Sequence, residues 1–234
     1  ANLLLYGYGS YGSSMSPSFS STRLSLIDRD IIWATAHIRG GMECGMRWWK
    51  HGKMLNKKNT FNDYICCAEH LIKNKYTSKG SVIGMGGSAG GLLMGAVLNI
   101  RPQLFSGVIM AVPFVDSLTT NLNHALPLTV GEFKEFGNAK KYKKHFQYIK
   151  SYAPYNNIKR QKYPHILVTT SLFDNRVLFD EPTKYVAKLR SYKKDNNILL
   201  LKTEMEGGHG GRTGRDAGIE EIAFDYSFIL KIIS

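Results

Sequence analysis

At 234 residues, 43% of them hydrophobic and 21% charged, the chain is long enough for one sizeable core, and its composition argues against an intrinsically disordered protein. Its 31 lysines and arginines exceed its 18 aspartates and glutamates, which gives a formal net charge of +13. The lysines are spread over several separate stretches without a nucleic-acid-binding motif, so we interpret them as a solvated basic surface and expect no nucleic-acid partner.

Cysteine content and hydropathy narrow the class of protein further. Cys44, Cys66 and Cys67 fit neither a metal-ligand spacing nor a disulfide framework, which is typical of proteins from the reducing cytoplasm. No apolar run is long enough to span a bilayer and no signal peptide is visible, so we expect a cytoplasmic protein with no membrane partner. Because the chain begins at Ala1 and enters an apolar run almost at once, we expect a fragment of a longer protein.

Apolar, strand-like runs alternate with helical patterns along the whole chain. The predicted buried strands are residues 3–6, 31–36, 81–83, 108–112, 166–170 and 198–201. The predicted helices are residues 60–74, 92–98, 182–192 and 216–233. Between them, residues 117–163 have a looser pattern of polar loops and short helices, which we interpret as an insertion over the strand ends. This alternation predicts an α/β fold with one mostly parallel sheet covered by helices on both faces.

Two of the predicted helices carry a start signal. The pattern Thr60-x-x-Asp63 resembles a capping box, which predicts that the first helix begins there. Pro182 stands early in a later helix, where its missing N–H costs nothing.

A glycine-rich turn at residues 84–91 joins a predicted strand to a predicted helix. Its pattern Gly86-x-Ser88-x-Gly90 is the signature of a nucleophile elbow, in which a strained turn lifts a serine hydroxyl above the sheet. The helix N-terminus and the N–H of Ala89 would then favour an oxyanion. The alternatives are an ordinary glycine-rich loop or a phosphate cradle, but no Gly-Lys-Ser/Thr follows as a phosphate loop requires.

Polar residues at the ends of later strands supply candidate partners for this serine. His209 stands between two pairs of glycines just after the last strand, where flexible backbone can bring an imidazole over the elbow. Asp174 and Asp116 both follow strands and compete as the acid. We prefer Asp174, because it lies one strand before the histidine, and expect Asp116 to line a pocket or cap a loop. The chain order serine, acid, histidine is that of α/β-hydrolases.

An oxyanion hole needs a second donor from the loop after the first strand. That loop lacks the His-Gly-Gly-Gly run of esterases and carries Tyr8, whose phenol can donate through its O–H. Glycine-tyrosine turns are common, so the pattern alone does not decide the role of Tyr8.

Several runs of the sequence are similar to a known family. Residues 5–12, 86–91 and 206–210 resemble the catalytic domain of the prolyl oligopeptidase family of serine peptidases. The oligopeptidase B branch of that family is favoured by residues 36–41, 90–99, 112–116 and 185–190. The similarity covers essentially the entire chain, so residues 1–234 are expected to form one peptidase catalytic domain.

The resemblance implies the residues of the site. Position by position, Ser88, Asp174 and His209 match the catalytic triad, and Tyr8 matches the tyrosine that completes the oxyanion hole. The remaining matches are an arginine that anchors the substrate backbone, the acid that receives a basic side chain before the scissile bond, and two aromatic pocket walls: Arg176, Glu132, Phe114 and Tyr11. A carboxylate at Glu132 is physically apt, since a buried cation needs a counter-charge.

The resemblance also implies an architecture and partners. It predicts an α/β-hydrolase fold that lacks the family's first strands and its β-propeller, and it predicts short peptides as substrates, cut after lysine or arginine through an acyl-enzyme. No metal and no organic cofactor is expected.

The chain departs from the family pattern, and other functions stay open. The family often has a second acid two residues after the first, where this chain has Lys134. A positive charge there is expected to weaken the capture of lysine or arginine, unless Lys134 points to solvent or Glu135 substitutes for the acid. The same triad serves prolyl-oligopeptidase-type peptidases, acylaminoacyl peptidases and esterases. An inactive catalytic-domain fragment is the alternative from a different class.

Overall fold

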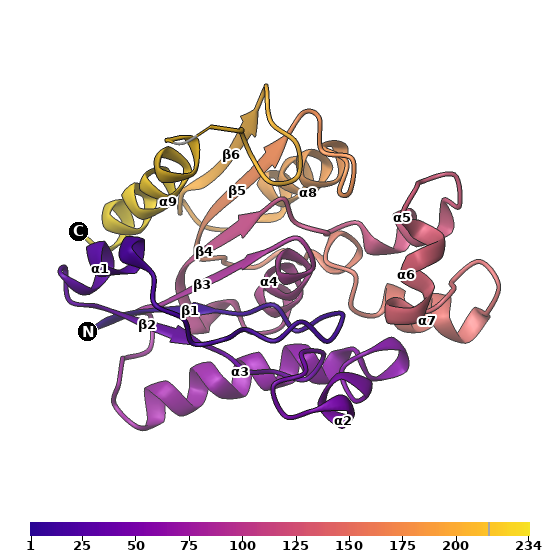
Figure 1. Cartoon of the computed structure of the whole chain (residues 1–234), viewed down its shortest axis with the longest axis horizontal. Helices are drawn as coiled ribbons and strands as arrows, with labels where there is room; N and C mark the ends of the chain where they lie inside the picture. The colour runs from indigo at the N-terminus through magenta and orange to yellow at the C-terminus, as the bar shows by residue number, and fades with distance from the viewer. Residues whose placement is uncertain (215) are drawn as a thin grey trace.

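The computed structural model describes residues 1–214 and 216–234. Its six strands form one parallel sheet in the order β2-β1-β3-β4-β5-β6 (Figure 1). The strands are β1 (Asn2–Tyr6), β2 (Ile31–Thr35), β3 (Val82–Gly87), β4 (Phe105–Ala111), β5 (His165–Ser171) and β6 (Leu199–Glu204). All six lie where the apolar runs predict them, because strands buried on both faces read as continuous apolar sequence.

Helices connect the strands and cover both faces of the sheet (Figure 1). The α-helices are α1 (Ser21–Ile27), α2 (Met46–Lys50), α3 (Lys58–Lys73), α4 (Ala89–Ile100), α5 (Ser117–Leu122), α6 (Thr129–Phe136), α7 (Lys143–Lys150), α8 (Asp180–Tyr192) and α9 (Ala217–Ile233). Three single 3₁₀ turns are η1 (Met54–Asn56), η2 (Pro102–Leu104) and η3 (Tyr155–Asn157). Among the described residues, no helix has the length and apolarity that crossing a membrane requires.

Side chains alternate along the strands and supply two cores. Leu3 and Leu5 of β1 join a core with residues of α3, α4 and α8, whereas Leu4 joins a second core with residues of α1 and α9. Helix α4 is apolar on every side and buried over residues 89–99, so it lies beneath the sheet's central strands rather than at the surface. The turn that enters α4 is thereby fixed at the middle of the sheet.

The loosely patterned segment between β4 and β5 forms α5, α6 and α7, which lie together at one side of the sheet (Figure 1). The chain leaves the carboxyl end of β4 to reach them. In parallel sheets, binding sites gather outside the carboxyl ends of the strands. This insertion therefore supplies walls for a site there.

The predicted capping box is wrong. Helix α3 begins at Lys58, so Thr60 already lies inside its first turn. The Thr60 hydroxyl donates instead to the carbonyl oxygen of Arg39 at 2.7 Å, and the Asp63 carboxylate binds the Arg39 side chain, with Nε to Oδ2 at 2.7 Å. Both side chains are used to join α3 to the loop after β2, and this tertiary demand overrides the local pattern.

Candidate active site

The turn from β3 into α4 holds Ser88 in an unusual backbone conformation. Its φ of 55° and ψ of −116° lie where residues with a Cβ rarely occur, so the surroundings must hold it there. The backbone N–H of Ser88 donates to the carbonyl oxygen of Ala111 at 2.8 Å, and the backbone carbonyl oxygen of Ser88 accepts from Phe114 N–H at 3.0 Å. Both contacts come from the end of β4 and the residues just after it. The strained serine is therefore clamped by the neighbouring strand.

The glycines of the turn are required by close backbone approach. A Cβ on Gly86 would lie 2.5 Å from the Gly90 oxygen, and a Cβ on Gly90 would lie 2.8 Å from the Gly7 oxygen. Cβ atoms in folded proteins essentially never lie within 3.0 Å of another heavy atom to which they are not bonded. Because only glycine fits, α4 can start directly beneath Ser88, as a nucleophile elbow requires.

Asp174 and His209 meet across the ends of β5 and β6. Asp174 Oδ2 lies 2.7 Å from His209 Nδ1, and the two side chains are 0% and 15% exposed. Asp174 Oδ1 accepts the backbone N–H groups of Arg176 at 2.8 Å and Val177 at 2.9 Å. Burial raises the pKa of the Asp174 carboxyl, but these three hydrogen bonds outweigh it and hold the pKa below its ordinary value. The carboxylate is thus kept charged against the imidazole.

Ser88 also lies at the carboxyl ends of the strands, but its hydroxyl is not hydrogen-bonded to the imidazole. Within residues 1–214 and 216–234, no hydrogen bond joins Ser88 Oγ to His209. The serine lines a pocket of about 360 Å³, and the histidine lines a neighbouring pocket of about 240 Å³. In unliganded sites such bonds are commonly long and shorten when substrate binds. The serine–histidine contact therefore stays a prediction.

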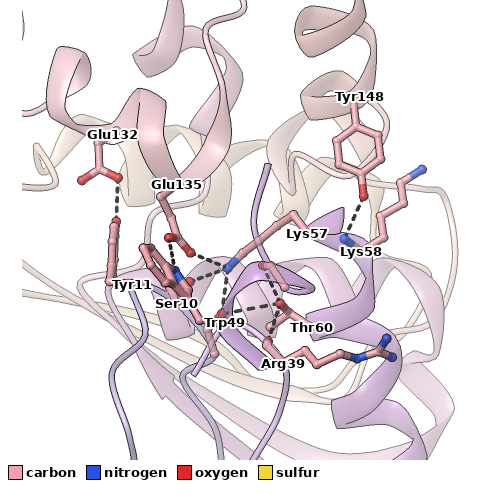
Figure 2. Close-up of polar contacts among 12 residues, drawn as sticks. Ser10, Tyr11, Arg39, Trp49, Lys57, Lys58, Thr60, Glu132, Glu135 and Tyr148 are labelled. Carbon is pink, nitrogen blue, oxygen red and sulfur yellow. Dashed lines mark hydrogen bonds and ion pairs between the residues drawn. The ribbon is translucent and has the colours of Figure 1, made fainter. Parts of the chain in front are cut away.

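The larger pocket brings together most of the residues that the sequence singles out. It is lined by Ser88 together with both candidate tyrosines, the aromatic wall, the acid and the arginine: Tyr8, Tyr11, Phe114, Glu132 and Arg176. Two segments far apart in the chain meet in it, the loop after β1 and helix α6. Their contact is a hydrogen bond of 2.8 Å from the Tyr11 hydroxyl to Glu132 Oε2 (Figure 2).

The electrostatics of the pocket favour a cation in it and a neutral phenol beside it. Burial raises the pKa of the Glu132 carboxyl, so this group gains by pairing with a positive charge. Burial also raises the pKa of Tyr8 to about 12, and the nearby charges of Tyr6, Glu132 and Glu135 add to the rise. The Tyr8 phenol consequently keeps its proton at neutral pH and remains a hydrogen-bond donor. Among the described residues, no group of three or more His, Cys, Asp or Glu side chains is arranged to hold a metal ion.

The three charged residues that the sequence left undecided lie outside this pocket. Lys134 is exposed on α6, so its charge is directed to solvent. Glu135 is buried and accepts a hydrogen bond from Trp49 Nε1, so it does not replace the missing second acid. Asp116 accepts from the Thr119 hydroxyl and the Lys184 ammonium instead of lining the pocket.

Comparison with known proteins assigns the family. The profile described as "Prolyl oligopeptidase family" matches residues 17–234, which are most of the chain.

The chain belongs to the prolyl oligopeptidase family.

Among relatives of the family, Protease 2 of Moraxella lacunata is 50% identical over 230 residues, which are 98% of this chain and 33% of that protein. Dipeptidyl aminopeptidase BI of Pseudoxanthomonas mexicana is 46% identical over 98% of this chain and 32% of that protein. The solved structure of oligopeptidase B from Leishmania major has a TM-score of 0.96 and 48% identity, over 99% of this chain and 32% of the other. Oligopeptidase B from Trypanosoma brucei with covalently bound antipain has a TM-score of 0.96 and 47% identity, over 98% of this chain and 32% of that one.

These comparisons confirm the resemblance and the fold class that the sequence predicts. The fold is that of the catalytic α/β-hydrolase domain of a prolyl oligopeptidase. The chain spans about a third of the length of the relatives that it matches.

The structure adds a pocket residue that the sequence did not single out. Glu181, in the first turn of α8, lines the pocket although its side chain is almost fully buried. Its carboxylate accepts a hydrogen bond from the Thr120 hydroxyl and one from Asp116 N–H at 2.9 Å. Burial raises the pKa of Glu181 to about 7. Acidic residues are ordinary in the first turn of a helix, so nothing in the sequence distinguished this one.

Proposed function

We propose that this chain is the catalytic domain of a serine peptidase close to oligopeptidase B, which hydrolyses short peptides after lysine or arginine. The observation that carries the proposal is that the half-buried Glu132 carboxylate lines the same pocket as Ser88. A guanidinium or ammonium bound there would replace its lost hydration by a charged hydrogen bond. The oligopeptidase B of Trypanosoma brucei that holds covalently bound antipain supports a covalent intermediate in this branch of the family.

The proposed chemistry uses residues that follow β3, β5 and β6 at the carboxyl ends of the strands. Ser88 Oγ attacks the carbonyl carbon of the substrate while His209 Nε2 takes its proton, and Asp174 holds Nδ1 and stabilises the imidazolium. His209 then protonates the leaving amine, and the acyl group stays on Ser88. Water, deprotonated by the same imidazole, attacks the acyl ester, and the imidazolium returns that proton to Ser88 Oγ as the carboxylic acid product leaves.

Two donors stabilise the oxyanion, and an arginine holds the substrate. The Ala89 N–H opens helix α4, where the helix dipole adds to its attraction for negative charge. The Tyr8 phenol is the second donor, and the Arg176 guanidinium anchors the carbonyl groups of the bound peptide; both side chains line the pocket.

A panel of peptide substrates that differ only in the residue before the cut tests the proposal. We expect the full-length protein to prefer arginine and lysine, and Ser88→Ala to abolish both cleavage and labelling by a serine-directed phosphonate. A preference for neutral residues would overturn the specificity, and labelling that persists in Ser88→Ala would overturn the nucleophile. Comparing the full-length protein with this chain alone tests whether the domain is inactive in isolation.

A dipeptidyl aminopeptidase activity is the second candidate, because a relative of that name is 46% identical. Substrates with a free or a blocked N-terminus distinguish the two, since only an endopeptidase accepts the blocked form. Within the main proposal, the full-length protein carries a β-propeller next to this domain and acts in the cytoplasm.

A further inference from the structure

A buried ion pair lies behind the candidate substrate pocket. Lys57 Nζ is 3.5 Å from Glu135 Oε1, and the two side chains are 1% and 4% exposed (Figure 2). Burying two charges costs so much hydration that such a pair adds little to stability compared with apolar residues of the same volume. We therefore expect the pair to matter mainly through the segments that it holds together.

Lys57 holds the loop after β1. Its ammonium donates to the carbonyl oxygen of Gly9 at 2.7 Å. It also donates to the Ser10 hydroxyl at 2.6 Å (Figure 2). Both acceptors are buried, and Tyr8 and Tyr11 stand directly before and after them in the chain. The ammonium therefore fixes the short piece of backbone from which both pocket tyrosines project.

Glu135 holds helix α6 against the same ammonium. Its Oε2 accepts from Trp49 Nε1 at 2.9 Å, which leaves Oε1 facing Lys57. Glu132 stands three residues earlier on α6, one helical turn away and next to Glu135 on the helix surface. At the pocket, the Tyr11 hydroxyl donates a hydrogen bond to Glu132, which joins the loop after β1 to α6 a second time. Loop and helix are thus joined twice, once in the core and once in the pocket.

We propose that Lys57 and Glu135 are positioning residues that keep Tyr8 and Glu132 in one fixed relation. This inference rests on the proposed function, in which Tyr8 receives the oxyanion and Glu132 the basic side chain of one substrate. Both groups must be correctly placed at the same moment, because a misplacement of about 1 Å typically costs about a hundredfold in rate. The pair supplies that common reference because it touches both segments at once.

Neutral, nearly isosteric variants test the inference in the full-length protein. Lys57→Met removes the donor to Gly9 and Ser10, and Glu135→Gln removes the counter-charge while its amide oxygen still accepts from Trp49. Each single variant leaves one buried charge uncompensated and is expected to lower the denaturation midpoint. The double variant has no unpaired charge, so its midpoint is expected to return toward that of the wild type.

Activity separates positioning from a purely structural role. We expect kcat/KM for an arginyl peptide to stay about tenfold to a hundredfold below the wild type in the double variant, although its stability recovers. For a small neutral ester, which makes no use of Glu132, Glu135→Gln is expected to leave KM unchanged. A double variant with the kcat/KM of the wild type on the arginyl peptide would overturn the inference, as would a Glu135→Gln variant whose activity loss is the same on both substrates.

A matched pair elsewhere in the chain is the control. Lys193 and Asp195 form an ion pair whose side chains are 10% and 7% exposed, and neither lines the pocket. Lys193→Met is expected to lower the denaturation midpoint and leave kcat/KM per folded molecule unchanged. The wild-type preference for arginine is measured in the same assay, so a failure of the proposed specificity is seen before any variant is compared. If the wild type shows no preference for arginine, kcat of Lys57→Met for the neutral ester still tests whether Lys57 positions the loop after β1, which carries Tyr8. A lowered kcat would support that role, and an unchanged kcat would contradict it.

Discussion

At the scale of single residues, the site depends on a serine in a backbone conformation that glycine adopts more readily. Ser88 has a φ of 55°, and such conformations cost about 1–3 kcal/mol for a residue with a Cβ. The backbone hydrogen bonds of Ser88 with Ala111 and Phe114 offset this cost. At Ser88 the strain accompanies a side chain that lines the candidate pocket, so we expect this position to serve activity rather than stability.

The strain predicts a difference in stability between two inactive variants. Ser88→Gly relieves the conformation, whereas Ser88→Ala keeps the Cβ and serves as its control. After the extra backbone entropy of glycine is subtracted, we expect Ser88→Gly to have the larger free energy of unfolding by about 1 kcal/mol. Urea denaturation of both variants measures this, and an equal or greater stability of Ser88→Ala would show that the turn is unstrained.

The phenol of Tyr8 is predicted to act in the chemical step. Tyr8→Phe keeps the ring and removes the donor, so kcat for an arginyl peptide should fall by about a hundredfold, the usual effect of losing one oxyanion donor. KM should change little, because the donor acts on the charge that develops during the reaction. Steady-state kinetics decide the matter, and unchanged turnover would remove Tyr8 from the mechanism.

Glu132 is predicted to set specificity without affecting the chemistry. Glu132→Gln keeps the size and the acceptor for Tyr11 but removes the charge, so kcat/KM for arginyl peptides should fall by about tenfold to a hundredfold, as for other lost charged hydrogen bonds. Hydrolysis of a neutral ester is the internal control and should be nearly unchanged. Equal losses on both substrates would mean that Glu132 supports the fold of the pocket instead.

At the scale of elements, helix α8 is joined to α5 by buried carboxylates. Glu181 of α8 accepts from Asp116 N–H and the Thr120 hydroxyl, and Lys184 of α8 donates to the Asp116 carboxylate. The loop before α8 carries Asp174. This link therefore sets where the acid and the pocket wall stand relative to the insertion.

The Glu181 carboxyl makes this link dependent on pH. Its pKa is raised from 4.5 to about 7 by burial, so the folded protein holds the proton more tightly than the unfolded chain. Between these two pH values the free energy of unfolding contributed by Glu181 falls as pH rises. We expect the wild type to lose stability relative to Glu181→Gln between pH 5 and pH 7.5, measured by denaturation of both proteins. A difference that does not change over this range would contradict the raised pKa.

The six strands, the four long helices α3, α4, α8 and α9 and the elbow were predictable, whereas the short helices α1 and α2 and the polar links between elements were not. Apolar runs such as Leu3–Leu5 located the strands because burial on both faces leaves a local signature. The capping box predicted at Thr60 was wrong because a threonine hydroxyl near a helix start can donate to a distant carbonyl oxygen as readily as it accepts from a nearby backbone N–H. Lys57 and Glu135 gave no signal at all, since the burial of a charged side chain depends on a partner 78 residues away. The Asp174–His209 contact was predictable from chain order along a parallel sheet.

At the scale of the whole molecule, apolar side chains lie exposed beside the edge of the sheet. Strand β2 is at the edge and pairs only with β1 among the described strands. In and before α1, which packs on β2, Phe19 is 82% exposed, Ile27 52% and Leu24 43%. Exposed strand edges and apolar patches promote association with other chains.

We expect this chain, expressed alone, to be poorly soluble and to self-associate as its concentration rises. Phe19→Ser combined with Ile27→Ser should reduce the association without lowering the denaturation midpoint, because neither side chain is buried. Sedimentation velocity over a concentration series measures this. A highly soluble monomer at every concentration would contradict the prediction.

The way Asp174 is held has a consequence for how such enzymes diversify. Asp174 Oδ1 accepts hydrogen bonds from the backbone N–H groups of Arg176 and Val177. Every amino acid except proline has such a backbone N–H group. The side chain at position 176 can therefore be exchanged to suit a new ligand while the proton relay beside it keeps its geometry. Substitutions in this short loop can therefore change what the pocket binds and leave the catalytic reaction unchanged.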